Sequence, residues 1–300
     1  GIGVVPGRTW SSSRGNYCST GYELPAPDFG WNGEKGIASG GGIVGGVEVI
    51  WNRLMFPIPL HQITIKPIET MKTIGFILFP QLTQLDLTGP YEVFARLPDT
   101  QVLLLAHTLD PIATEKGLSI LPNCSFADSP QLDVICVPGG PGINACLTDD
   151  VMLNFLRQQS IQAEYVTSVC TGALILAAAG LLEGYQATTH WLSLDLLRMF
   201  GVDVRTDRVV QDRNRITGGG VTAGIDFGLA LAAELFGKAT AEAIQLMMEY
   251  NPQPPFDSGH PSCATEEIVN KVQAMAAPYQ EERRKIVAEI AVHSSLTKRS

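Results

Sequence analysis

The stretch that decides the fold is Glu164-Tyr-Val-Thr-Ser-Val-Cys-Thr-Gly-Ala-Leu-Ile-Leu-Ala-Ala-Ala-Gly180. Its first half contains β-branched and aromatic residues, which favour a buried strand. Its second half is rich in Ala and Leu and ends at a glycine, which favours a helix with a glycine stop. Cys170 lies where the two halves meet, so we expect a sharp strand-to-helix turn with Cys170 at its tip.

A cysteine at such a turn faces the first N–H groups of the helix, which have no partner within the helix. Together with the helix dipole, these donors are expected to stabilise a thiolate and to lower the pKa of the Cys170 thiol. The N–H group and hydroxyl of Thr171 can serve an anionic intermediate. The competing interpretation is a structural cysteine buried in a strand, because most unpaired cysteines are inert.

From Met71 onward, strand and helix signals alternate along the chain. Apolar runs predict buried strands at 73–79, 101–106, 132–137 and 165–169, polar strands follow near 204–211, and helices are predicted near 87–97, 151–159, 173–180, 193–200, 223–236 and 239–250. This alternation predicts an α/β fold with an open, mostly parallel central sheet and helices on both faces. In such folds, ligands bind at the carboxyl ends of the strands.

The strand-end rule selects Asp86 and the pair Gly139 and Gly140 as candidate site residues. Asp86 follows the first strand region and is expected to be the N-cap of the next helix, a carboxyl group that faces the site, or both, since the two roles are not exclusive. Gly139 and Gly140 follow the third buried strand. Their N–H groups would receive a developing negative charge, or the two glycines form only a tight turn.

His190 is a further candidate, in the segment Thr188-Thr-His-Trp191 after the Cys170 helix. It is either a base or orienting group, or a histidine packed beside a tryptophan in the core. The segment Thr217-Gly-Gly-Gly220 precedes a helix and could bind an anion at the helix N-terminus. It lacks the Gly-Lys-Ser/Thr sequence of a phosphate-binding loop, which argues against nucleotide binding.

Residues 1–70 differ in composition from the rest of the chain. They contain three of the four tryptophans, and their charges cancel. The segment Gly40-Gly-Gly-Ile-Val-Gly45 matches a dinucleotide-binding glycine pattern only formally, because no strand precedes it. We therefore expect residues 1–70 to be a poorly ordered extension, followed by an α/β domain at 71–263 and a helical tail at 264–300.

Composition excludes several classes of function. The 300 residues carry a net charge of −9 with a sequence pI near 5.0, which argues against a nucleic-acid partner. The longest strongly apolar run, 173–182, is about half of a membrane span, so no membrane association is expected. The six cysteines form no C-x-x-C pair, which predicts neither a metal site nor a disulfide framework and fits a reducing cytoplasm.

The C-terminal tail is predicted to be helical and exposed. Thr265 is a suitable cap for a helix with Glu266 and Glu267 in its first turn. Pro278 is expected to interrupt this helix, and the run Glu281-Glu-Arg-Arg-Lys285 reads as a solvated face of the next one.

Several motifs, taken in order, resemble the ThiJ/PfpI-like branch of the glutamine-amidotransferase-like superfamily. The motifs are Asp86-x-x-Gly-Pro-x-Glu-Val-Phe94, Val137-Pro-Gly-Gly-x-Gly142, Val169-Cys-Thr-Gly-Ala173, Ala187-Thr-Thr-His-Trp191 and Thr217-Gly-Gly-Gly-x-Thr-Ala-Gly-x-Asp226. The resemblance covers Met71 to about Cys263. The segment Tyr250-Asn-Pro-Gln-Pro-Pro-Phe-Asp-Ser-Gly259 adds a likeness to the isonitrile-hydrating branch.

This resemblance implies a flavodoxin-like sandwich, a homodimer, no cofactor and a small isonitrile as the substrate. It further implies that Cys170 is the nucleophile, Asp86 the acid/base and Thr171 a supporting residue. Members of the intracellular protease branch have a histidine directly after the cysteine, where this chain has Thr171. Many superfamily members have Glu at the position of Asp86, so the shorter side chain leaves more room above the sulfur.

Two alternatives share these motifs. One is another ThiJ/PfpI-like enzyme, such as a deglycase, glyoxalase or amidase. The other is a sensor domain related to AraC-like transcription regulators, which add two helix-turn-helix units. No helix with a basic recognition face is evident after Tyr250.

Overall fold

The computed structural model describes residues 43–44, 47–48 and 71–297, and side chains are described up to residue 292. The chain divides into two compact units, 1–65 and 66–300. In the first unit, the two-residue strands β1 (Ile43–Val44) and β2 (Val47–Glu48) pair antiparallel. The rest of the expected extension and glycine pattern lies outside the described residues.

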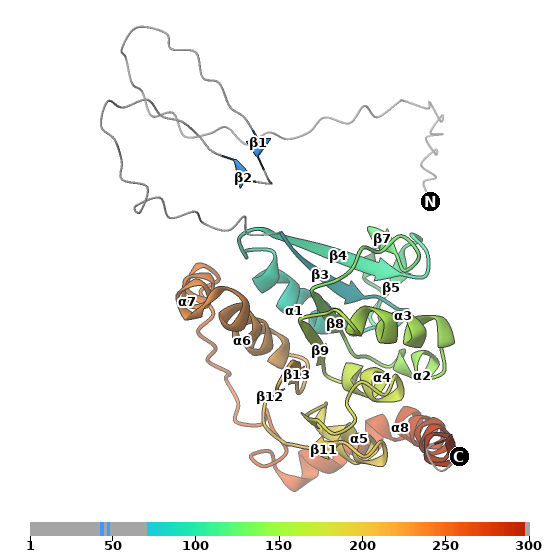
Figure 1. Cartoon of the computed structure of the whole chain (residues 1–300). Helices are drawn as coiled ribbons and strands as arrows, with labels where there is room; N and C mark the ends of the chain where they lie inside the picture. Colours follow the sequence, from blue (N-terminus) through green and yellow to red (C-terminus); the bar gives the residue numbers. More distant parts are fainter. Residues whose placement is uncertain (1–42, 45–46, 49–70, 298–300) are drawn as a thin grey trace, which may run out of the picture. The chain divides into compact units, whose positions relative to one another are not determined.

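The second unit is built on a seven-stranded sheet (Figure 1). Its strand order is β12-β13-β9-β8-β3-β4-β7, and all neighbours are parallel except β12 and β13. The strands span β3 (Lys72–Ile77), β4 (Thr100–Ala106), β7 (Cys124–Ser125), β8 (Val134–Val137), β9 (Tyr165–Val169), β12 (Val209–Asp212) and β13 (Arg215–Gly218). The expected open, mostly parallel sheet is confirmed.

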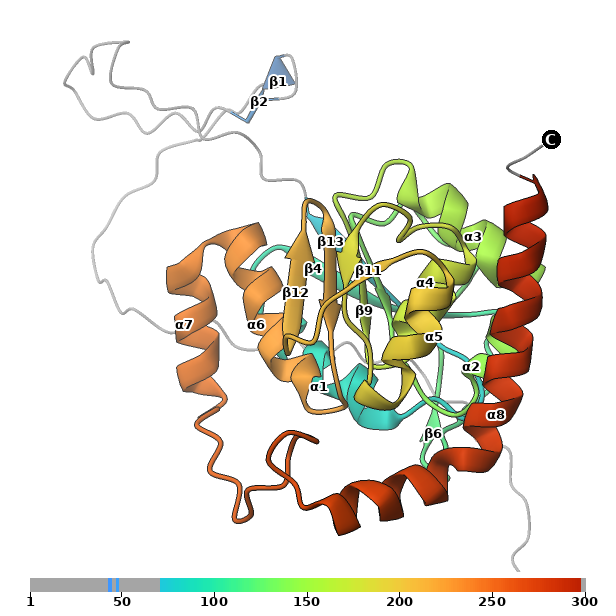
Figure 2. The ribbon, with the colours of Figure 1, turned by 90° about the horizontal axis from the view of Figure 1, so that it is seen from below.

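Helices cover both faces of this sheet, as the two views show (Figures 1 and 2). One face carries α1 (Gln84–Phe94), α6 (Ala223–Phe236) and α7 (Lys238–Met247). The other carries α2 (Ile143–Cys146), α3 (Asp150–Ser160), α4 (Gly172–Ala178), α5 (Leu194–Met199) and α8 (Glu266–Thr297). Because both faces are covered, the central strands consist of buried apolar runs; every residue of β8 is buried.

Short elements surround this framework, and of the strands among them only the one that contains Val204 falls within a predicted region, the polar strands near 204–211. The short elements are the hairpin β5 (Ile112–Ala113) and β6 (Ser119–Ile120), the pair β10 (Gln186–Ala187) and β11 (Asp203–Val204), and the 3-10 helix η2 (Trp191–Ser193). Such short runs carry little hydrophobic periodicity, and tertiary pairing decides them.

The C-terminal tail differs from expectation. It forms one helix, α8, that continues through Pro278 where an interruption was predicted. A proline inside a helix removes one backbone hydrogen bond and kinks the helix. Figure 2 shows that α8 bends along its length. The bent helix follows the outside of the α/β unit and packs against α2, α5 and η2.

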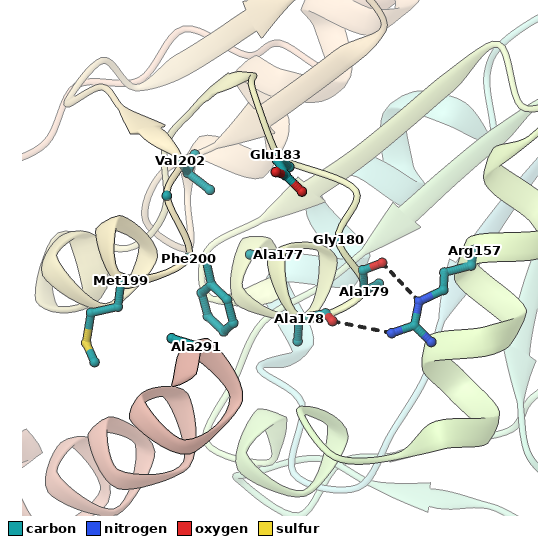
Figure 3. Close-up of a pocket in the computed structure, with 11 residues that line it drawn as sticks. Arg157, Ala177, Ala178, Ala179, Gly180, Glu183, Met199, Phe200, Val202 and Ala291 are labelled. Atoms are coloured by element: carbon teal, nitrogen blue, oxygen red, sulfur yellow. Dashed lines mark hydrogen bonds between the residues drawn. The ribbon is translucent and has the colours of Figure 1, made fainter. Parts of the chain in front are cut away.

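The helix that follows Cys170 is fixed at its far end by an arginine from α3. Arg157 donates from Nε to the carbonyl of Ala179 (3.0 Å) and from an Nη atom to the carbonyl of Ala178 (3.5 Å) (Figure 3). These carbonyls belong to the last turn of α4, where a positive charge is stabilising. The same residues line a cavity of about 360 Å³. It shares no lining residue with the cavity at Cys170.

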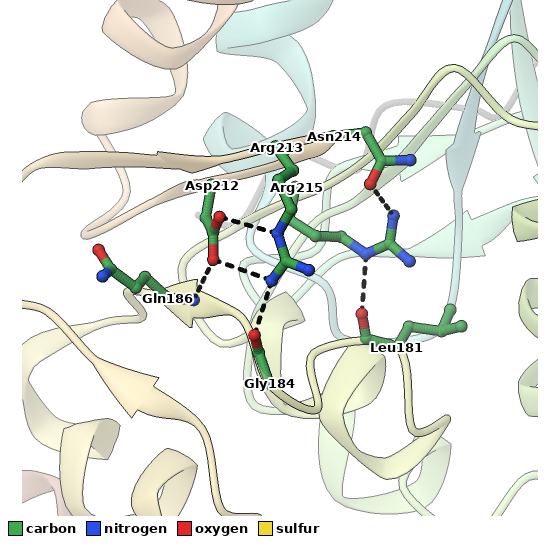
Figure 4. Close-up of polar contacts among 7 residues, drawn as sticks. All are labelled: Leu181, Gly184, Gln186, Asp212, Arg213, Asn214 and Arg215. Atoms are coloured by element: carbon green, nitrogen blue, oxygen red, sulfur yellow. Dashed lines mark hydrogen bonds and ion pairs between the residues drawn. The ribbon is translucent and has the colours of Figure 1, made fainter.

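The loop after α4 is held by two arginines at the turn between β12 and β13 (Figure 4). Arg215 donates from Nε to the Leu181 carbonyl (2.8 Å), and Arg213 donates from Nη2 to the Gly184 carbonyl (2.6 Å). Both guanidinium groups lie over the Tyr185 ring. The carboxyl end of the Cys170 helix is therefore anchored from two neighbouring elements.

We predict that Arg157→Met lowers the free energy of unfolding by about 1–2 kcal/mol, because two α4 carbonyls lose a charged donor. Lys285→Met is the matched control: its partner is Glu281, one turn away on an exposed helix face. That change should cost at most about 0.5 kcal/mol. Urea unfolding measures both. Equal effects of the two substitutions would contradict a capping role for Arg157.

Candidate active site

Cys170 lies at the tip of the turn between β9 and α4, as predicted. Its backbone has φ 55°, in the left-handed region that non-glycine residues rarely adopt. The Cys170 N–H donates to the Gly218 carbonyl (3.0 Å), and the Cys170 carbonyl accepts from the Thr189 hydroxyl (2.8 Å). These bonds fix both sides of the residue, which is how surrounding structure holds a strained nucleophile in place.

Glycines allow the strand ends to come close beneath this turn. A Cβ atom on Gly172 would lie 2.1 Å from the Val137 carbonyl oxygen. A Cβ atom on Gly139 would lie 2.5 Å from the Thr171 nitrogen and 2.9 Å from Asp86 Oδ2. Only glycine fits at these positions, because the backbones of β8 and α4 touch there.

Asp86 is fully buried and belongs to the first turn of α1. The helix begins three residues earlier than expected, so its N-cap is Thr83, and the N-cap assignment for Asp86 is wrong. Asp86 Oδ2 accepts a hydrogen bond from the Gly139 N–H (3.0 Å). Among the described residues, Oδ1 has no hydrogen-bond partner. The carboxyl group therefore faces the site with one oxygen available.

Gly139 and Gly140 lie beside Cys170, but their N–H groups are already engaged within the protein. Gly139 donates to Asp86, and Gly140 donates to the hydroxyl oxygen of Thr171 (3.0 Å). These two N–H groups therefore hold Asp86 and Thr171 in place and are not open for a ligand. Gly140 also lines the cavity at Cys170.

The ionisation of Asp86 and Cys170 is coupled. Burial raises the pKa of Asp86 to about 7, against hydrogen bonds from Cys170 and Gly139 that lower it. Burial, followed by the negative charge of Asp86, raises the pKa of the Cys170 thiol well above its ordinary value. The N–H and hydroxyl of Thr171 oppose this shift. The expected net lowering of the thiol pKa is therefore wrong, because desolvation outweighs the helix donors.

At neutral pH Asp86 is part ionised and part protonated, and where it is ionised the pair holds one proton. With Asp86 ionised, that proton is on the Cys170 sulfur. Moving it to Asp86 gives a thiolate beside a neutral carboxyl group with the same total charge. This arrangement can form a nucleophile and a proton donor in a single transfer.

A cavity of about 110 Å³ opens above Cys170. Its lining comes from several elements: Thr83, Glu115, Gly140, Pro141, Cys170, Thr171, His190, Leu192, Val221, Tyr279, Gln280 and Arg283. A second cavity of about 320 Å³ shares the side chains of His190 and Val221 with it and includes Gly219 and Gly220. The predicted residues Cys170, Thr171, Gly140 and His190 thus line one cavity. Asp86 and Gly139 are not in its lining; Asp86 lies behind it, hydrogen-bonded to the Gly139 N–H and to Cys170.

His190 is neutral in this setting. Burial, followed by the positive charge of Arg283, lowers the pKa of His190 to about 4. Its Nδ1 accepts from the Leu192 N–H (3.4 Å), which leaves the ring proton on Nε2. His190 can therefore donate one hydrogen bond into the cavity, and it is a weak base.

Arg283 is the residue that sequence reasoning missed. The run 281–285 was expected to be a solvated helix face, yet Arg283 has only 2% of its surface exposed. It extends from α8 into the cavity at Cys170. Its neighbours Arg284 and Lys285 are exposed, as predicted. The sequence signal was weak, because a single inward residue in a charged run does not alter helical periodicity.

Among the described residues, no cluster of three His, Cys, Asp or Glu side chains is arranged to hold a metal ion. The five described cysteines, Cys124, Cys136, Cys146, Cys170 and Cys263, are all free. Within the same part of the chain, no helix has the length and apolarity needed to cross a membrane.

Comparison with known proteins places this site in a family. The sequence profile of the DJ-1/PfpI family matches residues 72–234. Isonitrile hydratase from Pseudomonas putida is 53% identical over 223 residues, which cover 74% of this chain and 98% of that protein. The transcriptional regulator GbdR from Pseudomonas aeruginosa is 33% identical over 187 residues, covering 60% of this chain and 51% of the regulator.

Solved structures agree with this relationship. The crystal structure of a ThiJ/PfpI family protein from Pseudomonas syringae is 41% identical with a TM-score of 0.71, and the match covers 72% of this chain and 90% of that one. Drosophila melanogaster DJ-1β is 25% identical with a TM-score of 0.56, covering 60% and 98%. The chain belongs to the DJ-1/PfpI family.

We predict that Thr171→Val shifts the alkylation of Cys170 by iodoacetamide to higher pH by about one unit, because the sulfur loses a hydroxyl donor. Thr171→Ser keeps the hydroxyl and serves as the control. Mass spectrometry of the Cys170 peptide separates this reaction from that of exposed Cys263. An unchanged pH profile in the valine variant would show that the hydroxyl does not act on the sulfur.

Proposed function

We propose that this protein is a hydro-lyase that hydrates isonitriles to N-substituted formamides. The observation that carries the proposal is the buried Asp86 and Cys170 pair, which holds one transferable proton at the tip of a strained turn. An isonitrile needs both a nucleophile and a proton at the same carbon, and this pair supplies both. The alignment with isonitrile hydratase over 98% of that protein supports the same substrate class.

In the first step, the Cys170 sulfur attacks the terminal carbon of R–N≡C. The thiol proton passes to the Asp86 carboxylate as the C–S bond forms, and Asp86 then delivers it to the same carbon. The product is a covalent thioimidate, R–N=CH–S, on Cys170. The raised pKa of Asp86, about 7, allows this group both to accept and to release the proton near neutral pH.

In the second step, water adds to the thioimidate carbon. Asp86, again a carboxylate, takes a proton from the water and passes it to the nitrogen, giving R–NH–CH(OH)–S. The hydroxyl proton then leaves as the C–O double bond forms and the C–S bond breaks. The formamide R–NH–CHO is released, and the proton returns to the Cys170 and Asp86 pair. Atoms and charge balance over the cycle.

The cavity dimensions fit a small reacting group with a larger substituent. The space of about 110 Å³ above Cys170 accommodates the isonitrile carbon and nitrogen with a short substituent. The adjoining cavity of about 320 Å³ shares His190 and Val221 with it and offers room for a bulkier one. The neutral His190 can donate a hydrogen bond from Nε2 at this boundary.

A regulatory role has less support than the enzymatic one. The match to the regulator GbdR covers 51% of that protein, whereas the match to isonitrile hydratase covers 98%. The motifs that this chain shares with the regulator are explained by a common fold, and a fold does not by itself specify a function.

Substitution of the two reacting groups tests the proposal. Cys170→Ala should abolish release of formamide from cyclohexyl isonitrile, because no covalent intermediate can form. Asp86→Asn should keep the shape of the site and lower the rate by about 10²- to 10⁴-fold, because proton transfer is lost. Asp86→Glu should retain partial activity. Formamide release by wild type and each variant is measured by chromatography at matched folded fraction.

Cys263→Ala, a change in an exposed loop, is the control and should retain the wild-type rate. The wild-type rate should fall as pH drops through about 7, because protonated Asp86 can no longer accept the thiol proton. Asp86→Asn should lack this acidic limb. Wild-type turnover by Asp86→Asn would show that the acid/base assignment is wrong, and His190 would be the next residue to test.

We also propose that the protein acts as a homodimer. Large apolar side chains are exposed at the end of α7 and in the segment that follows it: Leu246 (81%), Met247 (70%) and Phe256 (79%). The segment 251–261 is rich in proline and connects α7 to α8. Exposed apolar surface of this kind is typical of an interface between subunits.

A dimer predicts twice the chain mass of 32.3 kDa in sedimentation equilibrium at micromolar concentration. Replacing Leu246 and Phe256 by Ser should weaken the association, whereas replacing exposed Leu109 by Ser should leave it unchanged. A monomer at micromolar concentration in the wild type would rule the proposal out.

A further inference from the structure

The proposed reaction creates negative charge at two atoms, and the expected glycine donors do not serve them. Charge develops on the Cys170 sulfur when its proton moves to Asp86, and on the oxygen of the addition intermediate as the hydroxyl proton leaves. Gly139 and Gly140 use their N–H groups on Asp86 and Thr171. Burial makes an unassisted anion at this position costly. The N–H and hydroxyl of Thr171 favour the thiolate, yet the pKa of the thiol is raised in spite of them, so a further donor is expected in the cavity.

Arg283 is a cation in the lining of this cavity. It is held from three sides: Nε donates to Asn144 Oδ1 (2.8 Å), Nη1 to the Ser193 hydroxyl (3.5 Å) and Nη2 to the Gly140 carbonyl (3.4 Å). These contacts come from α2, η2 and the loop after β8. The guanidinium group is therefore fixed beside the turn that carries Cys170.

All three partners of Arg283 are neutral. Among the described residues, no carboxylate forms an ion pair with it. A guanidinium group has five N–H donors, and the contacts above use three of them. A buried charge without a counter-ion is unfavourable for folding, so such a group is expected to meet a negative charge during function.

We propose that Arg283 is the anion-stabilising residue of the active site and that it contacts the reacting atoms. Its remaining N–H donors stabilise the thiolate of Cys170 and the oxygen of the hydration intermediate. For the oxygen of the intermediate this inference rests on the proposed function; for the Cys170 sulfur it does not. A preorganised cation in a dry site acts strongly on developing charge, because little water is present to screen it.

The other ionisable groups at the site do not supply this charge. Asp86 from α1 and Glu115 from the β5–β6 turn are acidic. His190 is neutral, Tyr279 is a phenol, and Glu282 is engaged by Asn144 (3.2 Å). Burial lowers the pKa of Arg283 only to about 10, so Arg283 remains protonated at neutral pH, and the charge of Cys170 favours its protonated form.

Arg283→Met, Arg283→Gln and Arg283→Lys test the proposal, with Arg284→Met as the matched control. Arg284 is the next residue of α8 and pairs with Asp195 on the exposed face of the helix. Loss of the cation should lower kcat for isonitrile hydration about 10²-fold with little change in KM, because the charge forms during the reaction. The lysine variant should recover part of the rate, and Arg284→Met should match the wild type.

A second measurement does not depend on the substrate. The pH profile of Cys170 alkylation by iodoacetamide should shift to higher pH by about one unit in Arg283→Met and Arg283→Gln, because a cation no longer favours the thiolate. Arg283→Lys should shift less. Circular dichroism shows which variants are folded. If Arg283→Met is unstable, Arg283→Gln takes its place in the test, because glutamine can keep polar contacts to Asn144 and Ser193.

The hydration rate and the alkylation profile together distinguish failure of the proposed function from failure of the proposed role of Arg283. If the wild type does not hydrate isonitriles but the alkylation profile shifts, the proposed function is wrong and Arg283 still stabilises the thiolate. If folded Arg283→Gln keeps both the wild-type kcat and the wild-type alkylation profile, Arg283 has only a structural role and the inference is overturned.

Discussion

The active site depends on the left-handed backbone conformation of Cys170. A non-glycine residue in this conformation costs about 1–3 kcal/mol, so the surrounding structure must impose it. It does so through the Gly218 carbonyl, the Thr189 hydroxyl and the close approach of Gly172 to β8. The parallel sheet supplies these contacts, because its central strands end at the same edge. The strain places the sulfur above that edge instead of within the core.

The environment of the sulfur combines opposing effects. The N-terminus of α4 and Thr171 favour a thiolate, whereas burial and Asp86 oppose it. The balance keeps the proton within the pair until a substrate carbon can receive it. Charge therefore forms mainly during the proposed reaction, in which one carbon receives both a proton and a nucleophile.

Sequence patterns predicted β3, β4, β8 and β9 and the long helices, because these elements have strong periodicity, but not the short strands β7 and β13 of the same sheet. They also placed Cys170 and Asp86 at strand ends, where topology brings separate segments together. They failed where tertiary contact decides the outcome. The pKa of the Cys170 thiol depends on how deeply the sulfur is buried. The partner of the Gly139 N–H depends on which acceptor lies within reach in the folded protein. The position of Arg283 depends on the path of α8 around the sheet. None of these leaves a local signal in the chain.

The path of α8 also bears on the order in which the site forms during synthesis. Asp86 and Cys170 leave the ribosome before Arg283, so the segments that form the sheet are synthesised before α8. The sheet and the Cys170 turn can therefore assemble while the cavity still lacks its arginine. In that interval the sulfur lacks the buried cation beside it and is open to solvent on one side. Docking of α8 then closes one side of the cavity at Cys170, so the site is complete only once this helix has packed.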